Sequence, residues 1–276
     1  MSPSRPEDSP LGQGAPRQAV LFADYSRGWG GGQHWHLSMA KGLHARGWPV
    51  ALLAHRQGEL ARRGREAGLI VWPMRLGAHT LADPWHLYKI FQRILDLHPL
   101  AVICNSATEL KTAGLAARMA QVPQIIPRRG IPQPLRNSLF NRLALQYLAT
   151  RLITNSQATL DAMYAGNPTL VAALRPRVQH NGVDPAQWPA PPPRAPSGRI
   201  VVVGRLTAEK GVERAISAMP RVLDQAPRAE LHLWGDGEER PALERLAASL
   251  SVDHAVYFHG ATQDVRAALL SADLLV

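Results

Sequence analysis

The strongest constraint on the fold is a repeated alternation of short apolar runs, rich in β-branched residues, with longer amphipathic segments. Three such runs, 199–204, 229–235 and 254–260, each end in glycine, and a fourth begins at residue 273. Alternation of this kind requires a parallel sheet with right-handed crossovers, and it predicts an α/β fold. Apolar residues at helical spacing place the predicted helices at 212–223, 243–250 and 265–270.

The first part of the chain repeats this pattern. Residues 19–24 (AVLFAD) form a predicted strand, which leads into a glycine-rich turn and a helix around residues 37–43. Five further apolar runs are strand candidates: 49–55, 69–74, 100–106, 123–128 and 151–156. We therefore expect two Rossmann-like, doubly wound parallel sheets, with a ligand in the cleft between the two domains.

A proline-rich segment divides the two parts. Residues 185–198 hold six prolines in fourteen positions, a density that neither a helix nor a central strand tolerates. We predict a disordered tail over 1–18, a first domain over 19–184, this linker, and a second domain over 199–276. The second domain is then about half the size of a complete Rossmann-like domain, so we expect the chain to be the N-terminal piece of a longer protein.

Charge separates the same two parts. The chain carries +10, but residues 1–190 carry +11 and the remainder carries −1. Residues 110–160 hold seven basic side chains and no acidic one, which favours an anionic partner for the first domain. Aromatic residues do not cluster with the basic ones, so we expect no nucleic acid partner. The sequence carries no signal for an oligomeric state.

Several other classes are excluded. A single cysteine, Cys104, rules out a disulfide scaffold, and no apolar run reaches the ~18 residues of a membrane span. The N-terminus lacks the apolar stretch of a secretory signal, so we expect a cytoplasmic protein. His34 and His36 lie two apart on a predicted helix and face different directions, and no Cys/His spacing indicates zinc, so we expect no metal.

Two segments carry residues suited to anion binding. The glycines at 30–32 precede a predicted helix, where free N–H groups attract anions, although a loop without a ligand explains them equally well. They match neither a Walker loop nor a dinucleotide fingerprint. In VVVGRLTAEKG, Arg205 follows a strand and Lys210 begins the next helix, where a diphosphate would be stabilised. The alternative is a surface ion pair between Arg205 and Glu209.

Taken together, the motifs resemble family 4 glycosyltransferases. The resemblance rests on GRLTAEKG, LHLWGDGEER and VYFHGATQDVRAALLSADLLV in the second part. In the first part it rests on GGGQHWHLSMAKGLHARGWPV, RLITNSQAT and VQHNGVD, so that it covers residues 19–276. It implies a GT-B fold, in which an N-terminal acceptor domain and a C-terminal donor domain transfer a sugar from a nucleotide sugar with retention of configuration. It also implies that no cofactor or metal is permanently bound.

The resemblance assigns roles to individual residues. Arg205 and Lys210 would hold the donor diphosphate and stabilise the leaving nucleotide. Gly204, Gly235 and Gly260 would border the nucleotide pocket, with His259 near the base, although Gly235 and Gly260 also fit simple turns. Gly31 and Gly32 would approach the phosphate or the acceptor from the opposite domain. The turn at residues 181–184 would lie near the hinge.

Three departures from the family pattern stand out. The Glu-x7-Glu segment that holds the donor sugar would follow DLLV and is absent, so we expect the chain to be truncated before it. His34 occupies a position where many members have an acidic residue. Pro127-Arg128-Arg129-Gly130 replaces a loop in which many members carry a histidine. Arg128 and Arg129 are therefore candidates for contact with a phosphate on the acceptor or donor.

Residues 138–152 (SLFNRLALQYLATRL) mix leucines with arginines. Either this segment rests on an anionic membrane surface, at the inner face of the cytoplasmic membrane, or it is an ordinary amphipathic helix packed on the sheet. We favour a retaining glycosyltransferase with an anionic acceptor, such as a lipid-linked or lipopolysaccharide-core glycan. The alternatives are a noncatalytic sugar-nucleotide-binding module or an inactive truncated fragment. A GT-B epimerase or phosphorylase is disfavoured by the GRLTAEKG and GDGEER segments.

Overall fold

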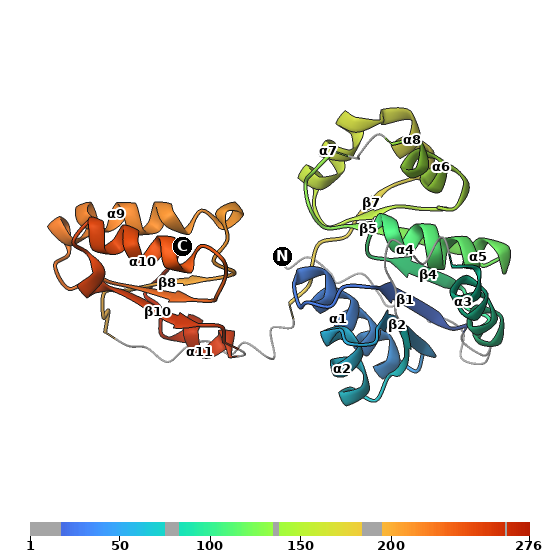
Figure 1. Cartoon of the computed structure of the whole chain (residues 1–276), viewed down its shortest axis with the longest axis horizontal. Coiled ribbons are helices and arrows are strands. Elements are labelled where there is room, and N and C mark those ends of the chain that lie inside the picture. Colours follow the sequence, from blue (N-terminus) through green and yellow to red (C-terminus); the bar gives the residue numbers. More distant parts are fainter. Residues whose placement is uncertain (1–17, 75–82, 135–137, 184–194, 263) are drawn as a thin grey trace, which may run out of the picture. The chain divides into compact units, whose positions relative to one another are not determined.

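The computed structural model describes residues 18–74, 83–134, 138–183, 195–262 and 264–276. The chain divides into two compact units, Met1–Gly182 and Val183–Val276, which Figure 1 shows in blue to yellow and in orange to red. Of the predicted tail, only residue 18 belongs to the described residues. Residues 185–194 of the predicted linker also lie outside them. No helix among the described residues is long and apolar enough to cross a membrane.

The first unit is built on a parallel sheet, and the described part of the unit contributes seven strands in the order β3-β2-β1-β4-β5-β6-β7. This order places β1 in the middle, with consecutive strands added outward on each side, as in a doubly wound fold. The strands are β1 (Val20–Asp24), β2 (Val50–His55), β3 (Ile70–Met74), β4 (Ala101–Cys104), β5 (Gln124–Arg129), β6 (Ile153–Thr154) and β7 (Arg177–Val178). The six predicted strands of the first part are confirmed, whereas β7 was not predicted.

Helices cover both faces of this sheet. On one face, α1 (Gly31–Ala45) and α2 (Glu59–Glu66) pack against the even-numbered residues of β1, such as Phe22. The other face carries α3 (Pro84–Leu97), α6 (Leu139–Tyr147), α7 (Gln157–Gly166), α8 (Pro168–Ala173) and a continuous helix made of α4 (Ala107–Glu109), a π-helical turn (Leu110–Gly114) and α5 (Leu115–Met119). Since consecutive strand residues face opposite sides, each of the strands β1–β5 contributes to both cores.

Polar caps mark where several of these helices begin. Ser106, Ser138 and Ser156 each accept a hydrogen bond from a backbone N–H in the first turn of the helix that follows. Such a bond satisfies an N–H group that has no partner inside the helix. Ser106 and Ser156 lie two residues after the ends of β4 and β6, so the helices that they cap begin at the carboxyl edge of the sheet.

The second unit has a parallel sheet in the order β10-β9-β8-β11. Its elements are β8 (Arg199–Val203), α9 (Val212–Gln225), β9 (Glu230–Trp234), α10 (Arg240–Ser249), β10 (Val256–Gly260), α11 (Val265–Leu270) and β11 (Leu274–Leu275). Helices α9 and α10 bury one face, and α11 lies on the other (Figure 1). The predicted α/β class, with parallel Rossmann-like sheets, is confirmed.

We expect Gly235→Ala to destabilise the second unit. A Cβ at Gly235 would lie 1.7 Å from the carbonyl oxygen of Gly204, whereas a Cβ at Gly204 would meet nothing within 4 Å. Overpacking at Gly235 should cost about 3 kcal/mol, which accelerates hydrogen exchange of the β8–β10 amides roughly 100-fold. Gly204→Ala is the matched control and should leave the exchange rates unchanged. Equal protection in both variants would contradict the predicted collision.

Candidate functional site

A buried carboxylate organises the carboxyl edge of the first sheet. Asp24 ends β1 and is 1% exposed. Its Oδ2 accepts hydrogen bonds from Gln33 Nε2 at 2.8 Å and Asn105 Nδ2 at 2.9 Å, and its Oδ1 accepts one from the Ser26 N–H at 2.9 Å. Asp24 therefore connects the start of α1 to the end of β4. Burial raises its pKa to about 6, against the opposing effect of these hydrogen bonds.

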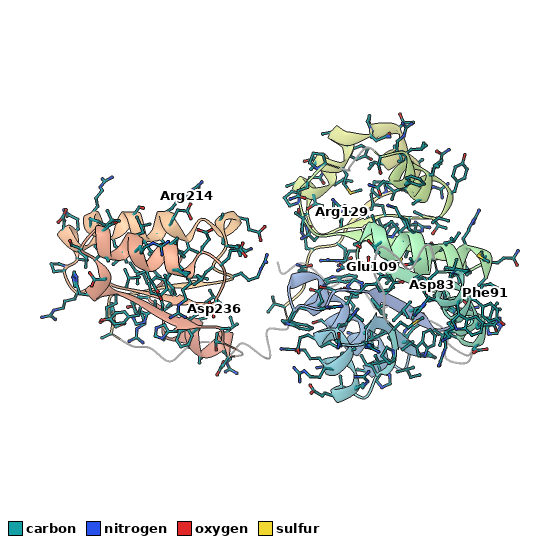
Figure 2. All side chains as sticks on the ribbon, in the orientation of Figure 1. Asp83, Phe91, Glu109, Arg129, Arg214 and Asp236 are labelled. Carbon is teal, nitrogen blue, oxygen red and sulfur yellow. The ribbon has the colours of Figure 1, made fainter. Side chains whose placement is uncertain are left out.

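A second buried carboxylate, Glu109, lies on the other side of this edge. It accepts a hydrogen bond from the Tyr25 N–H at 2.9 Å and another from the Ser106 hydroxyl. Figure 2 labels Glu109 in the first turn of the helix after β4 and Arg129 at the end of β5. The charge of Glu109 also raises the pKa of Asp24. None of Asp24, Gln33 and Glu109 was predicted as a site residue, although a polar residue directly after a buried strand run is a signal that the sequence offers.

The two arginines predicted to contact phosphate project to opposite faces of β5. Ile125 belongs to one core and Ile126 to the other, so Arg129 shares the face of Ile125 and Arg128 the face of Ile126. Arg128 is 4% exposed, and its guanidinium carbon lies 4.5 Å from the centroid of Trp35. Burial lowers the pKa of both arginines. They are adjacent in sequence, but they occupy different surroundings.

Gly31 and Gly32 are the first two residues of α1. A Cβ at Gly32 would lie 2.9 Å from side-chain atoms of Asn105, so Gly32 allows Asn105 to pack against the helix and reach Asp24. A Cβ at Gly31 would meet nothing within 4 Å. Open space beside Gly31 is compatible with the predicted ligand approach, whereas packing alone accounts for Gly32.

In the second unit, three predicted glycines meet where β8, β9 and β10 end. The Gly204 N–H donates to the Trp234 carbonyl at 3.0 Å, and the Gly235 N–H donates to the Gly260 carbonyl at 2.8 Å. Backbone therefore forms this edge, and the space beside Gly204 is open. His259, from the same edge, stacks on Trp234 with 4.0 Å between ring centroids.

The two predicted cations lie in the segment between β8 and α9. Arg205 follows Gly204 and pairs with Glu209 at 2.5 Å, with both side chains more than half exposed. The surface ion pair considered from the sequence is thus present. Lys210 is exposed and lies two residues before α9 begins. Among the described residues, no group of three or more His, Cys, Asp or Glu could hold a metal ion.

Asp24 and His36 should oppose each other in the pH dependence of stability. The pKa of Asp24 is raised from 3.8 to about 6. Protonated Asp24 therefore adds to the free energy of unfolding at acidic pH, and this contribution is lost as the pH rises through 6. Burial lowers the pKa of His36 from 6.5 to about 4, so its contribution is present above pH 6.5 and is lost as the pH falls through 4. Each change is on the order of 3 kcal/mol.

We therefore expect the two single substitutions to change the pH dependence of the free energy of unfolding in opposite directions between pH 4 and pH 6. In Asp24→Asn only His36 remains, so stability should rise with pH relative to the unsubstituted chain. In His36→Gln only Asp24 remains, so stability should fall. Urea unfolding of the full chain at several pH values measures both slopes, and other titrating groups cancel in the comparison. If both variants keep the original profile, the two pKa shifts are absent.

Known proteins resemble this chain along most of its length. Residues 29–187 match the family described as Glycosyltransferase Family 4, and residues 197–276 match Glycosyl transferases group 1. The glycogen synthase of Mycobacterium tuberculosis is 39% identical over 85 residues, which make up 30% of this chain and 20% of that protein. The lipopolysaccharide core biosynthesis glycosyltransferase LpsE of Rhizobium meliloti is 38% identical over 77 residues, 28% of this chain and 22% of its own length. The matches thus span about a fifth of these curated relatives.

Solved structures extend the likeness to the whole fold. The Anabaena protein HepE, crystallised with UDP and glucose, superimposes with a TM-score of 0.76 at 20% identity. The superposition covers 94% of this chain and 73% of HepE. Both units of the chain therefore have the GT-B type of fold that the motifs predicted. Because the first family match covers more than half of the sequence, the chain belongs to glycosyltransferase family 4.

Proposed function

We propose that this chain works as a glycosyltransferase, which moves a sugar from a nucleotide-diphosphate donor to an anionic acceptor with retention of configuration. One observation carries the donor half of the proposal. At the carboxyl edge of the second sheet, open backbone at Gly204 lies beside two exposed cations, Arg205 and Lys210. HepE, which shares the fold, has been crystallised with UDP and glucose.

The chemistry of this edge suits a diphosphate. Gly204 would let a phosphate approach the backbone, and the start of α9 adds N–H groups and the positive end of a helix dipole. Arg205 would exchange its exposed partner Glu209 for the diphosphate, at little cost because surface ion pairs are weak. In this proposal the two cations offset the negative charge that grows on the leaving nucleotide. No resident metal or cofactor is assigned a part.

The acceptor half of the proposal rests on the first unit. Arg128 and Arg129 end β5, and the excess positive charge of the chain lies before residue 191. Buried guanidinium groups favour phosphate or carboxylate ligands, which they bind in a bidentate manner. LpsE, which is similar over 77 residues, is a lipopolysaccharide core biosynthesis glycosyltransferase. We therefore assign an anionic glycan, lipid-linked or of the lipopolysaccharide core, as acceptor.

Helix α6 supports an acceptor held at a membrane. Its inner residues Ala144 and Leu145 are buried, whereas Leu139, Phe140 and Tyr147 are 64%, 71% and 61% exposed. The surface formed by Leu139, Phe140, Leu143 and Tyr147, here called the α6 patch, lies beside the exposed Arg142. Apolar side chains next to a cation are typical of helices that rest on anionic lipid. This arrangement supports a location at the inner face of the cytoplasmic membrane.

The donor assignment predicts that Lys210→Ala and Arg205→Ala each weaken sugar-nucleotide binding at least tenfold. Each removes a charge-assisted contact to phosphate. Thermal stabilisation by UDP-, GDP- and ADP-sugars first identifies the donor, and calorimetry with that donor then gives the dissociation constants. Arg228→Ala is the control, because this exposed arginine precedes β9 at the opposite edge of the sheet. Unchanged affinity in both site variants would refute the assignment.

The membrane assignment predicts flotation of the chain with anionic vesicles but not with neutral ones. The double substitution Phe140→Ser and Leu143→Ser should remove most of this binding, since it deletes two exposed apolar anchors. Met119→Ser is the control, because Met119 is 56% exposed at the far end of α5. Failure of the unsubstituted chain to float with either vesicle would exclude membrane contact through the α6 patch.

A further inference from the structure

The first unit contains a cavity of about 290 Å³ beneath α6. Its apolar wall includes Leu110 from the π-helical turn, Leu145 from α6 and Met163 from α7. Polar lining is supplied by Arg128 and Arg129, at the end of β5, and by Gln133, in the segment that follows. A cavity with an apolar wall and a cation at the strand end is suited to a ligand that is itself part apolar and part anionic.

Arg129 is the unusual member of this lining. Its Nε is buried and has no hydrogen-bond partner, and its Nη2 makes only a long 3.5 Å contact with the Gln133 carbonyl oxygen. None of the ion pairs found between described residues includes Arg129. A partly buried guanidinium without an anion is costly, because desolvation of the charge is not repaid by a counterion. The surroundings of Arg129 therefore favour an anionic ligand.

The alternation of side chains along β5 separates Arg129 from the Asp24 cluster. Arg128 lies over the ring of Trp35 in α1, whereas Arg129 shares the face of Ile125 with the core that includes Leu110 and Met163. Both arginines contribute to the lining of the cavity. An anion bound to Arg129 would thus lie on the opposite face of the sheet from Asp24. The described lining of the cavity contains no carboxylate, but it includes Arg128 and also Ser106, whose hydroxyl donates to Glu109.

Helix α6 joins the cavity to the α6 patch. Ala144 and Leu145 face inward and line the cavity, while Phe140 and Leu143 on the same helix are exposed. Asn141, in the first turn of α6, also lines the cavity. An apolar lipid chain that leaves a membrane at the α6 patch would therefore need to pass only helix α6 to reach Arg129.

We propose that this cavity binds a phosphorylated apolar chain, with the phosphate on Arg129 and the first carbons of the chain against Leu110, Leu145 and Met163. The proposal rests on the lipid-linked acceptor of the proposed function and names the place that holds its phosphate and lipid. The volume is near the lower limit of ligand pockets, about 300 Å³, so only the first part of a long chain enters. The remainder stays in the membrane.

The test uses the full chain and n-alkyl phosphates from ethyl to decyl, with inorganic phosphate as the reference probe. Each methylene that enters the cavity should improve affinity by about fourfold, and the improvement should stop once the cavity is full. Calorimetry below the micelle concentration measures this series. Affinity equal to that of inorganic phosphate at every chain length would overturn the proposal, and so would an increase that never levels off.

Two variants separate the ends of the site. Arg129→Gln should weaken binding of every alkyl phosphate at least tenfold, whereas Arg118→Gln, which removes an exposed arginine of α5, should not. Ala144→Phe should fill the cavity and abolish the dependence on chain length while weak phosphate binding persists. Circular dichroism checks that each variant folds. If Ala144→Phe does not fold, the Arg129→Gln and Arg118→Gln pair decides alone, and equal binding in that pair overturns the proposal.

Separate readouts distinguish this proposal from the proposed function. Binding of a sugar nucleotide without any response to alkyl phosphates would refute the cavity and leave the transferase assignment standing. If affinity for alkyl phosphates rises with chain length but no sugar nucleotide binds, the cavity proposal stands and the transferase assignment is refuted. Vesicle flotation identifies the source of the chain. If Ala144→Phe also lowers flotation on vesicles of anionic phospholipid, the cavity holds a membrane phospholipid; if it lowers only alkyl phosphate binding, the lipid-linked acceptor is the ligand.

Discussion

The carboxyl edge of the first unit depends on the buried carboxylate of Asp24. Donors from the turn after β1, from α1 and from the end of β4 all converge on its two oxygens. A charged group with 1% exposure is tolerable only because each oxygen is hydrogen-bonded. The carboxylate therefore fixes how α1 begins relative to β4, and Gly32 leaves the space that Asn105 needs. Arg128 and Trp35 are held against the same face.

The two units present the same edge of a parallel sheet with different chemistry. In the first, buried side chains of opposite charge, Asp24 and Arg128, form a desolvated edge. In the second, glycine backbone and the exposed cations Arg205 and Lys210 form an open one. Under the proposed function, the buried edge would select one acceptor, since its groups cannot rearrange to meet another. The open edge with its exposed cations would admit and release the diphosphate.

Much of the fold could be predicted from the sequence because its signals are local. Apolar runs and helical spacing are patterns within ten to fifteen residues, and they placed every strand except β7. They also placed helices α1, α9, α10 and α11, whereas α2, α3, α7 and α8 received no bounds from the sequence. The candidate site could be predicted from the sequence only in part. Gly204, Gly235 and Gly260 could be assigned to one edge from their positions after strands. The partners of Asp24 could not, because Asn105 lies 81 residues away and their contact depends on β1 and β4 being neighbours.

The pair Arg128 and Arg129 shows what strand geometry adds to a charge count. From the sequence they form one basic group, in which either arginine was a candidate for contact with a phosphate on the acceptor or donor. Alternation along β5 instead places Arg128 over the ring of Trp35 and places Arg129 on the face of Ile125, although both arginines contribute to the lining of the cavity under α6. Two adjacent arginines on a single strand therefore differ in their surroundings. Arg128 is buried against an aromatic ring, whereas Arg129 has a buried Nε without a hydrogen-bond partner among the described residues.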